Sequence, residues 1–263
     1  MSNLLLNDQR PGILKARVAA EKAFAAQIRK GNKAAWAIVE NALPEITQGK
    51  VAKALRPKVT DEVAKALHKA YMQGATNASS TLVLGENTWA RTIGAKADLF
   101  TDEELFDRYL KLFEPIGGFK GCTDTVTEDI QAKVAQFFAD PDATIQDLSN
   151  ALQSTFAPWR ADMIAISETT RMKSAQTELY QDALGSDSWT FQTEEDDLVC
   201  EECGPMDGEI FGPNDDKPPI HVNCRCEAVV STSYTALGQA FMDQWGIEIN
   251  IDEGDDLADA EAA

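Results

Sequence analysis

The sequence predicts a mainly helical α+β protein, in which a long helical N-terminal region precedes a small β-containing module. Three observations support this fold class. Apolar residues in the first half recur at helical spacing, the pattern changes to strand-like alternation after Gly185, and four of the five cysteines fall between residues 200 and 226. With 44% hydrophobic residues in 263, the chain has enough apolar side chain to bury a core.

The first part of the chain is expected to form two long helices. Between Ile13 and Val39, apolar residues recur near one helical face, and alanines between them favour helix. Pro44 is expected to break this pattern, and a second helix is expected to start after Thr60. The Ser- and Thr-rich stretch 74–94 is ambiguous and is compatible with a linker or a loop.

Three further helices are expected to start at motifs in which a threonine precedes an acidic residue by three positions. Such capping boxes satisfy the free N–H groups of a first helical turn. The motifs are Thr101 with Glu104, Thr125 with Glu128, and Thr144 with Asp147.

A last long helix should begin at Pro158 and end near Leu184, with Gly185 as its C-cap. Three short strands are expected after it, and a further helix around 237–245 is expected to pack on them. The strands are placed at 189–192, 209–211 and 227–230. We divide the chain into a helical region 1–157, a module 158–235, a C-terminal helix or strand 236–251, and an acidic, disordered tail 252–263.

The cysteines and one of the two histidines form a pattern typical of a metal site. Cys200 and Cys203 make a C-x2-C pair. After seventeen intervening residues, His221, Cys224 and Cys226 follow as H-x2-C-x-C. Two such pairs can converge on one tetrahedral ion, and zinc prefers thiolate and imidazole ligands. A structural zinc would stabilise a module that has few apolar residues of its own.

Five candidate ligands compete for four positions. We predict that Cys200, Cys203, His221 and Cys224 bind one zinc ion, with Cys226 as the alternative ligand. This set closes the coordination sphere, so a catalytic zinc with a bound water is disfavoured. Buried free thiols and a redox or disulfide pair are the competing interpretations.

The segments around the cluster resemble a known family. A helix with S-E-T-T-R at 167–171 precedes Trp189, and C-E-E-C, M-D-G and P-P-I-H-V-N-C-R-C follow in that order. Over about residues 160–230 this order is similar to the Mu F-like phage head-morphogenesis family of minor capsid proteins. Ser167 stands where the family usually has Thr, and Met206 where it usually has Leu.

The resemblance implies a minor capsid protein of a tailed phage or prophage. Such a protein would associate with the portal, meet capsid and scaffold proteins, and assist prohead assembly or DNA delivery. It would be in the host cytoplasm during assembly and then in the virion, in the capsid interior or at the portal vertex. The alternatives are a zinc-framed nuclease of His-Asn-His type and a non-viral, zinc-stabilised protein-binding module. No enzyme activity is expected, since a nuclease would need a second histidine near His221 and the chain has only His68 besides.

Charge is distributed unevenly along the chain. The net charge is −19, yet residues 1–70 hold 13 Lys and Arg against 6 Asp and Glu, leaving 11 against 37 in the remainder. The acidic majority disfavours nucleic-acid binding by the whole surface, while the basic stretch could meet an acidic protein or make weak contact with DNA. A simply solvated helix face is the alternative. The proposed basic surface comprises Lys15, Arg17, Lys22, Arg29 and Lys33.

No apolar run approaches the roughly 18 residues that a membrane helix needs, and the three leucines after Asn3 are too few for a signal-peptide core, so no membrane partner is expected.

Cys122 is expected to fill a gap in the core and His68 to lie on a solvated face. Glu168 and Arg171 should form an ion pair that holds the last helix to the module.

Asp207 and Gly208 should form a tight turn. The acidic run at 194–197 could bind a divalent cation through its oxygens, although a solvated loop is the commoner interpretation of such a run.

Overall fold

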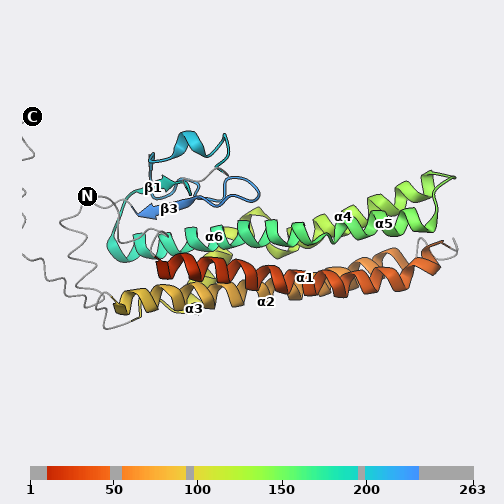
Figure 1. The fold of residues 1–263 in the computed structure, drawn as a ribbon, viewed down its shortest axis with the longest axis horizontal. Helices are drawn as coiled ribbons and strands as arrows, with labels where there is room; N and C mark the ends of the chain where they lie inside the picture. The colour runs from red at the N-terminus through yellow and green to blue at the C-terminus, as the bar shows by residue number, and fades with distance from the viewer. Residues whose placement is uncertain (1–10, 48–54, 93–97, 195–198, 231–263) are drawn as a thin grey trace, which may run out of the picture.

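In the computed structural model, six helices form an elongated bundle and a small module projects from one side of it (Figure 1). The structure describes residues 11–47, 55–92, 98–194 and 199–230. The predicted helix at 237–245, the segment 236–251 and the tail 252–263 lie outside these residues. The mainly helical α+β fold is confirmed.

Two long helices, α1 (Pro11–Thr47) and α2 (Leu55–Thr92), pack against each other over their length as an antiparallel hairpin. Their close approach depends on small residues. A Cβ atom added at Gly31 would lie 2.3 Å from the Cβ of Ala70, and one added at Gly85 would lie 2.3 Å from the Cβ of Ala16. The backbones therefore approach more closely at these positions than any larger side chain would permit.

Two helix boundaries differ from those predicted for the hairpin. Helix α1 continues through Pro44 to Thr47, because the exposed Pro44 removes only one hydrogen bond and lies close to the end of the helix. The stretch 74–92 is neither linker nor loop but the second half of α2, which starts at Leu55 and not after Thr60. Three of its threonine hydroxyls bond within the helix, as Thr81 Oγ1 does to the Asn77 carbonyl at 2.8 Å.

Four shorter helices complete the bundle. They are α3 (Asp102–Phe113), α4 (Gly118–Ala139), α5 (Ile145–Thr155) and α6 (Pro158–Leu184), and a 3₁₀ turn, η1 (Glu114–Ile116), joins α3 to α4. Helix α6 packs against α1 and α3, and α4 packs against α2 and α5.

Two of the three predicted capping boxes form in the structure. Thr101 and Thr144 each form a complete capping box, at the starts of α3 and α5. Thr125 does not, because α4 already begins at Gly118, and its hydroxyl donates to the Gly121 carbonyl one turn back. Pro158 and Gly185 bound α6 as predicted, with Gly185 at a φ of 63°.

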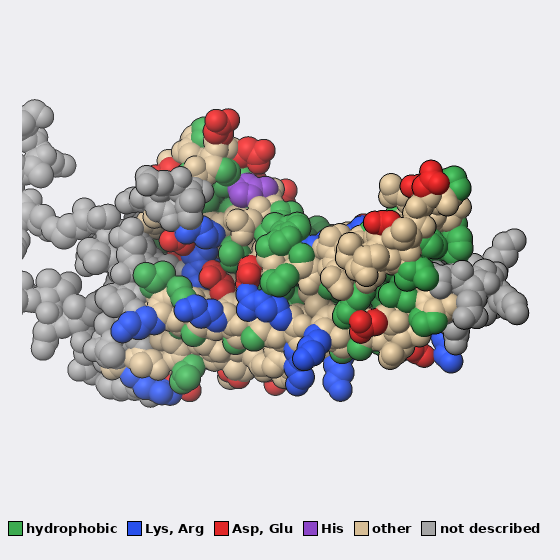
Figure 2. Space-filling view, turned by 45° about the vertical axis from the view of Figure 1, so that its right-hand side comes forward, with side chains coloured by type: hydrophobic (Ala, Val, Ile, Leu, Met, Phe, Trp, Pro, Cys, Tyr) green, Lys and Arg blue, Asp and Glu red, His purple; other side chains and the backbone are tan. Residues whose placement is uncertain are grey.

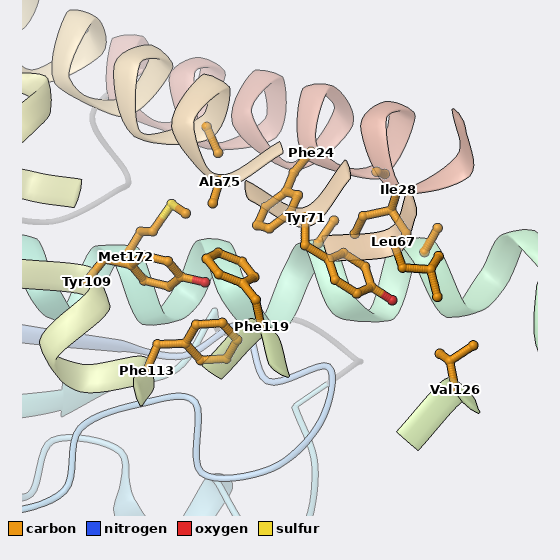
Figure 3. Packing of buried hydrophobic residues seen from close by; sticks show 14 of the residues in the cluster. Phe24, Ile28, Leu67, Tyr71, Ala75, Tyr109, Phe113, Phe119, Val126 and Met172 are labelled. Carbon is orange, nitrogen blue, oxygen red and sulfur yellow. The ribbon is translucent and has the colours of Figure 1, made fainter. Parts of the chain in front are cut away.

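Aromatic rings from α3 and α4 fill the centre of the bundle (Figure 3). Phe113 and Phe119 meet edge to face with centroids 4.9 Å apart, and Tyr109 stacks on Phe113 at 5.2 Å. Met172 of α6 and Phe24 of α1 close the same core. Helices from both halves of the chain contribute to this core, and it holds α6 against the hairpin.

A three-stranded antiparallel sheet forms the base of the module, in the order β2-β1-β3. The strands are β1 (Trp189–Gln192), β2 (Ile210–Phe211) and β3 (Glu227–Val230), with a second 3₁₀ turn, η2 (Gly204–Met206), before β2. The buried ring of Trp189 stacks on Phe211 at 4.6 Å. Cys203, Cys224 and Cys226 belong to the same small core, so the strand predictions are confirmed and the cysteines lie against the sheet.

The close packing of the hairpin can be tested by adding one methyl group. We expect Gly31→Ala to lower stability by about 1–3 kcal/mol, because Ala70 is fixed to its backbone and the helices must separate. In an open helix the same change usually stabilises. Gly12→Ala, where nothing lies within 4 Å, is the matched control and should not lower the melting temperature. Equal melting temperatures for Gly31→Ala and the unchanged protein would contradict the packing.

Candidate metal centre

One face of α6 holds the segment that carries His221 and the last two cysteines. Ser167, Thr170, Ser174 and Thr177 recur every three or four residues, so their hydroxyls share one side of the helix. Thr170 Oγ1 donates to the Cys224 carbonyl at 2.7 Å, and Ser167 Oγ accepts the Asn223 N–H at 2.8 Å.

The other two hydroxyls extend this row along the helix. Ser174 Oγ donates to the Pro218 carbonyl, and Thr177 Oγ1 donates to the Ala228 carbonyl of β3 at 2.6 Å. The four bonds fix the backbone from residue 218 to β3 against a rigid helix.

All five predicted ligands converge in the structure. His221 Nε2 lies 3.0 Å from Cys200 Sγ and 3.1 Å from Cys203 Sγ, and Cys203 Sγ lies 3.9 Å from Cys224 Sγ. In a tetrahedral zinc site with Zn–S bonds of about 2.3 Å, two sulfurs are separated by about 3.8 Å. The Cys203–Cys224 separation fits that geometry.

Two groups of potential ligands overlap at Cys203. One consists of Cys200, Cys203 and His221, the other of Cys203, Cys224 and Cys226, and within each group the ligand atoms lie within 4.8 Å of one another. Either group can hold a metal ion. The choice of Cys200, Cys203, His221 and Cys224, with Cys226 as the alternative, stays a prediction.

Local turns orient the ligands. Cys200 and Cys203 lie on one turn, in which the Cys203 N–H donates to Cys200 Sγ at 3.3 Å. His221 Nδ1 lies 2.8 Å from the Val222 carbonyl, which favours the tautomer that leaves Nε2 free as a ligand. Asn223 has a φ of 65°, a left-handed conformation that asparagine tolerates well, and this turns the chain between His221 and Cys224.

The electrostatic surroundings differ among the thiols. A hydrogen bond from Cys226, with backbone N–H groups and His221 adding to it, lowers the pKa of Cys224 to about 5. The Cys203 N–H lowers the pKa of Cys200, whereas burial raises the pKa of Cys203 to about 12. Two of the thiols are thus stabilised as thiolates, the form that binds metal.

Arg17 joins the hairpin to this centre. It is 2% exposed, and its guanidinium donates at 2.6 Å to the Arg225 carbonyl, which lies between the potential ligands Cys224 and Cys226. It also forms ion pairs with Glu194, with Glu227 at 3.2 Å and with Glu21 at 3.2 Å. Arg17 was predicted to belong to a basic surface, and that prediction is wrong because three carboxylates bury it.

Helix α1 is part of the bundle core as well as of the basic stretch. Helix α1 packs along α2 and α6, and it contributes Phe24 and Ile28 to the central core. Removal of the basic region would therefore also disturb the cysteine module. The division into 1–157 and 158–235 stays a prediction, although these contacts cross it.

The ion pair of Glu168 and Arg171 forms as predicted, at 3.1 Å, but its partners are on α3 and not on the module. Tyr109 donates to Glu168 Oε2 at 3.1 Å, and the Arg171 guanidinium lies over the ring of Phe113. The pair therefore fastens α6 to α3. Burial raises the pKa of Glu168.

The remaining predicted residues lie apart from the centre or support it structurally. Gly208 has a φ of 77° and Asp207 accepts the Thr193 N–H at 2.7 Å, which confirms the turn. His68 is exposed on α2, and Cys122 is half-buried beside the bundle core. Of the acidic run, Glu194 binds Arg17, while residues 195–197 lie outside the described part.

Residues 128–229 match the family model described as Phage Mu protein F like protein. The chain contains a Phage Mu F-like segment. This confirms the resemblance and extends it from α6 and the module back into α4. No curated protein and no solved structure matches the chain. The match supports a phage head-morphogenesis protein associated with the virion.

Within the described residues, none of the helices is both long and apolar enough to cross a membrane.

The role of Arg17 can be measured in a variant that keeps its volume. We expect Arg17→Met to lower stability by about 3–5 kcal/mol in chemical denaturation, because it removes the buried cation that pairs with the Glu194 and Glu227 carboxylates. Lys15→Met, at an exposed position of the same helix, is the control and should change stability little. If Arg17→Met unfolds at the same denaturant concentration as Lys15→Met, the cluster contributes nothing to stability.

Proposed function

We propose that the chain is a minor capsid protein that associates with the portal of a tailed phage and assists prohead assembly or DNA delivery. The match over residues 128–229 carries this proposal. The portal is the direct partner in this proposal, with capsid and scaffold proteins as neighbours. The site of action is the capsid interior or the portal vertex, after assembly in the host cytoplasm.

In this proposal one zinc ion stabilises the module. The donor set fits, since it contains buried thiols that form no disulfide and a histidine with Nε2 directed at two sulfurs. The ion would supply cross-links between the turn at Cys200 and the segment at His221, and no reaction is assigned to it. The proposal is non-enzymatic, because His68, the other histidine, lies on α2 and is not part of either ligand group.

The metal content tests the zinc. Protein purified without chelator should contain about one zinc per chain by elemental analysis. Cys203→Ser should lose the metal and unfold the module, because Cys203 belongs to both ligand groups. Cys122→Ser should keep the full zinc content. Metal-free wild-type protein would refute the site.

Two further variants show whether Cys200 or Cys226 completes the ligand set. If the predicted ligand set is correct, Cys200→Ser loses zinc and Cys226→Ser retains it. The opposite result would replace Cys200 by Cys226 while leaving the zinc centre intact.

Head incorporation tests the function. In a phage or prophage that encodes the chain, we expect it in purified proheads at a few copies, and we expect a variant phage without portal protein to produce heads that lack it. Cys203→Ser should be excluded from heads, whereas Cys122→Ser should enter at the normal copy number. Normal incorporation into portal-less heads would show that another head protein recruits the chain.

A further inference from the structure

The solvent side of α1 carries a row of cations. Lys15, Lys22, Arg29 and Lys33 are spaced by seven, seven and four residues, which places them along one face over about 27 Å. All four are exposed, and Arg29 pairs with the half-exposed Asp162. Alanines lie between them at positions 19 and 26, so no bulky side chain separates the row from an approaching surface. We call these four residues the basic row.

The tip of the cysteine module carries the opposite charge. Within the described residues 199–224, the exposed charged side chains are all acidic, because Lys217 is partly buried and pairs with Glu178. Figure 2 shows Asp and Glu gathered where the module projects and Lys and Arg along the helices below. The acidic tip comprises Glu201, Glu202, Asp207, Glu209, Asp215 and Asp216.

Exposed aliphatic side chains accompany both surfaces. Ile210 and Val222 of the module are 71% and 65% exposed. On α1, Leu14 and Val18 are 42% and 38% exposed and flank the start of the basic row. A contact that unites opposite charges with apolar side chains gains both orientation and desolvated area.

The two surfaces of one copy cannot meet. Arg17 fixes the base of the module to α1, and it lies on a different side of the helix from the basic row. Lys15, Lys22 and Lys33 are turned from it by about 140–160°, and Arg29 by about 120°. The module therefore projects on a side that the row does not face. Only another molecule can bring an acidic tip to the row.

We propose that the basic row of one copy binds the acidic tip of a second copy. The contact joins two different surfaces, so each copy offers one free row and one free tip, and repetition produces a ring or an open array. Because the charges are exposed, the attraction acts over about 10 Å at 0.1 M salt and weakens steeply at higher ionic strength.

Sedimentation velocity of the full-length, zinc-loaded protein tests this contact. We expect concentration-dependent association at low salt that is lost at high salt. Two double variants should each weaken association by roughly tenfold or more, Lys22→Glu with Lys33→Glu in the row and Glu209→Lys with Asp216→Lys in the tip. Lys65→Glu with Lys69→Glu, on exposed positions of α2, is the matched control and should associate normally.

Mixing the two charge-reversed proteins gives the decisive result. The reversed tip then fits the reversed row, and the unchanged row and tip fit each other, so the mixture should associate although neither protein does alone. A monomer at every salt and concentration, or association that survives both reversals, would overturn the proposal. A monomer that instead binds duplex DNA through the row would also overturn it, leaving the role in heads to its own test.

Discussion

The buried guanidinium of Arg17 is where the hairpin, α6 and the cysteine module meet. It binds a carbonyl that lies between two potential metal ligands and a carboxylate at the start of β3, and the Thr170 hydroxyl lies 3.4 Å away. A buried cation is costly unless several partners surround it, so the three carboxylates and the carbonyl form one interdependent arrangement. The position of α1 against the module therefore depends on the same backbone that positions Cys224 and Cys226.

The hydroxyl row of α6 has the complementary role. Arg17 binds the module from α1, while Thr170 and Thr177 bind it from α6, through the carbonyls of Cys224 and Ala228. The segment that carries the ligands contributes no regular secondary structure of its own between residues 212 and 226. Its shape therefore comes from bonds to neighbouring helices and, in the proposed function, from the zinc ion.

The parts that sequence reasoning predicted are those that local chemistry determines. The boxes at Thr101 and Thr144, the Pro158 and Gly185 limits of α6 and the convergence of the cysteines all follow from short-range spacing. Thr125 shows the limit, because a capping motif cannot signal that a helix has already begun at Gly118. Arg17 shows another limit. Its partners in the module lie 177 to 210 positions away, and they help to bury an arginine that looks exposed in the sequence. The second half of α2 was not predicted as helix for the same reason. Its alanines, serines and glycines fit a helix only because α1 packs against them.

The close packing of α1 on α2 fixes the rotational phase of both helices. Inserting one residue between Arg17 and Lys22 would turn everything beyond it by about 100° and advance it by about 1.5 Å, so Gly31 would no longer face Ala70. Seven inserted residues would restore the phase to within about 20° and lengthen the rod by about 10 Å. Natural relatives whose hairpins differ in length should therefore differ by paired insertions of about seven residues in each helix, and single-residue insertions should be confined to the connection between the two helices.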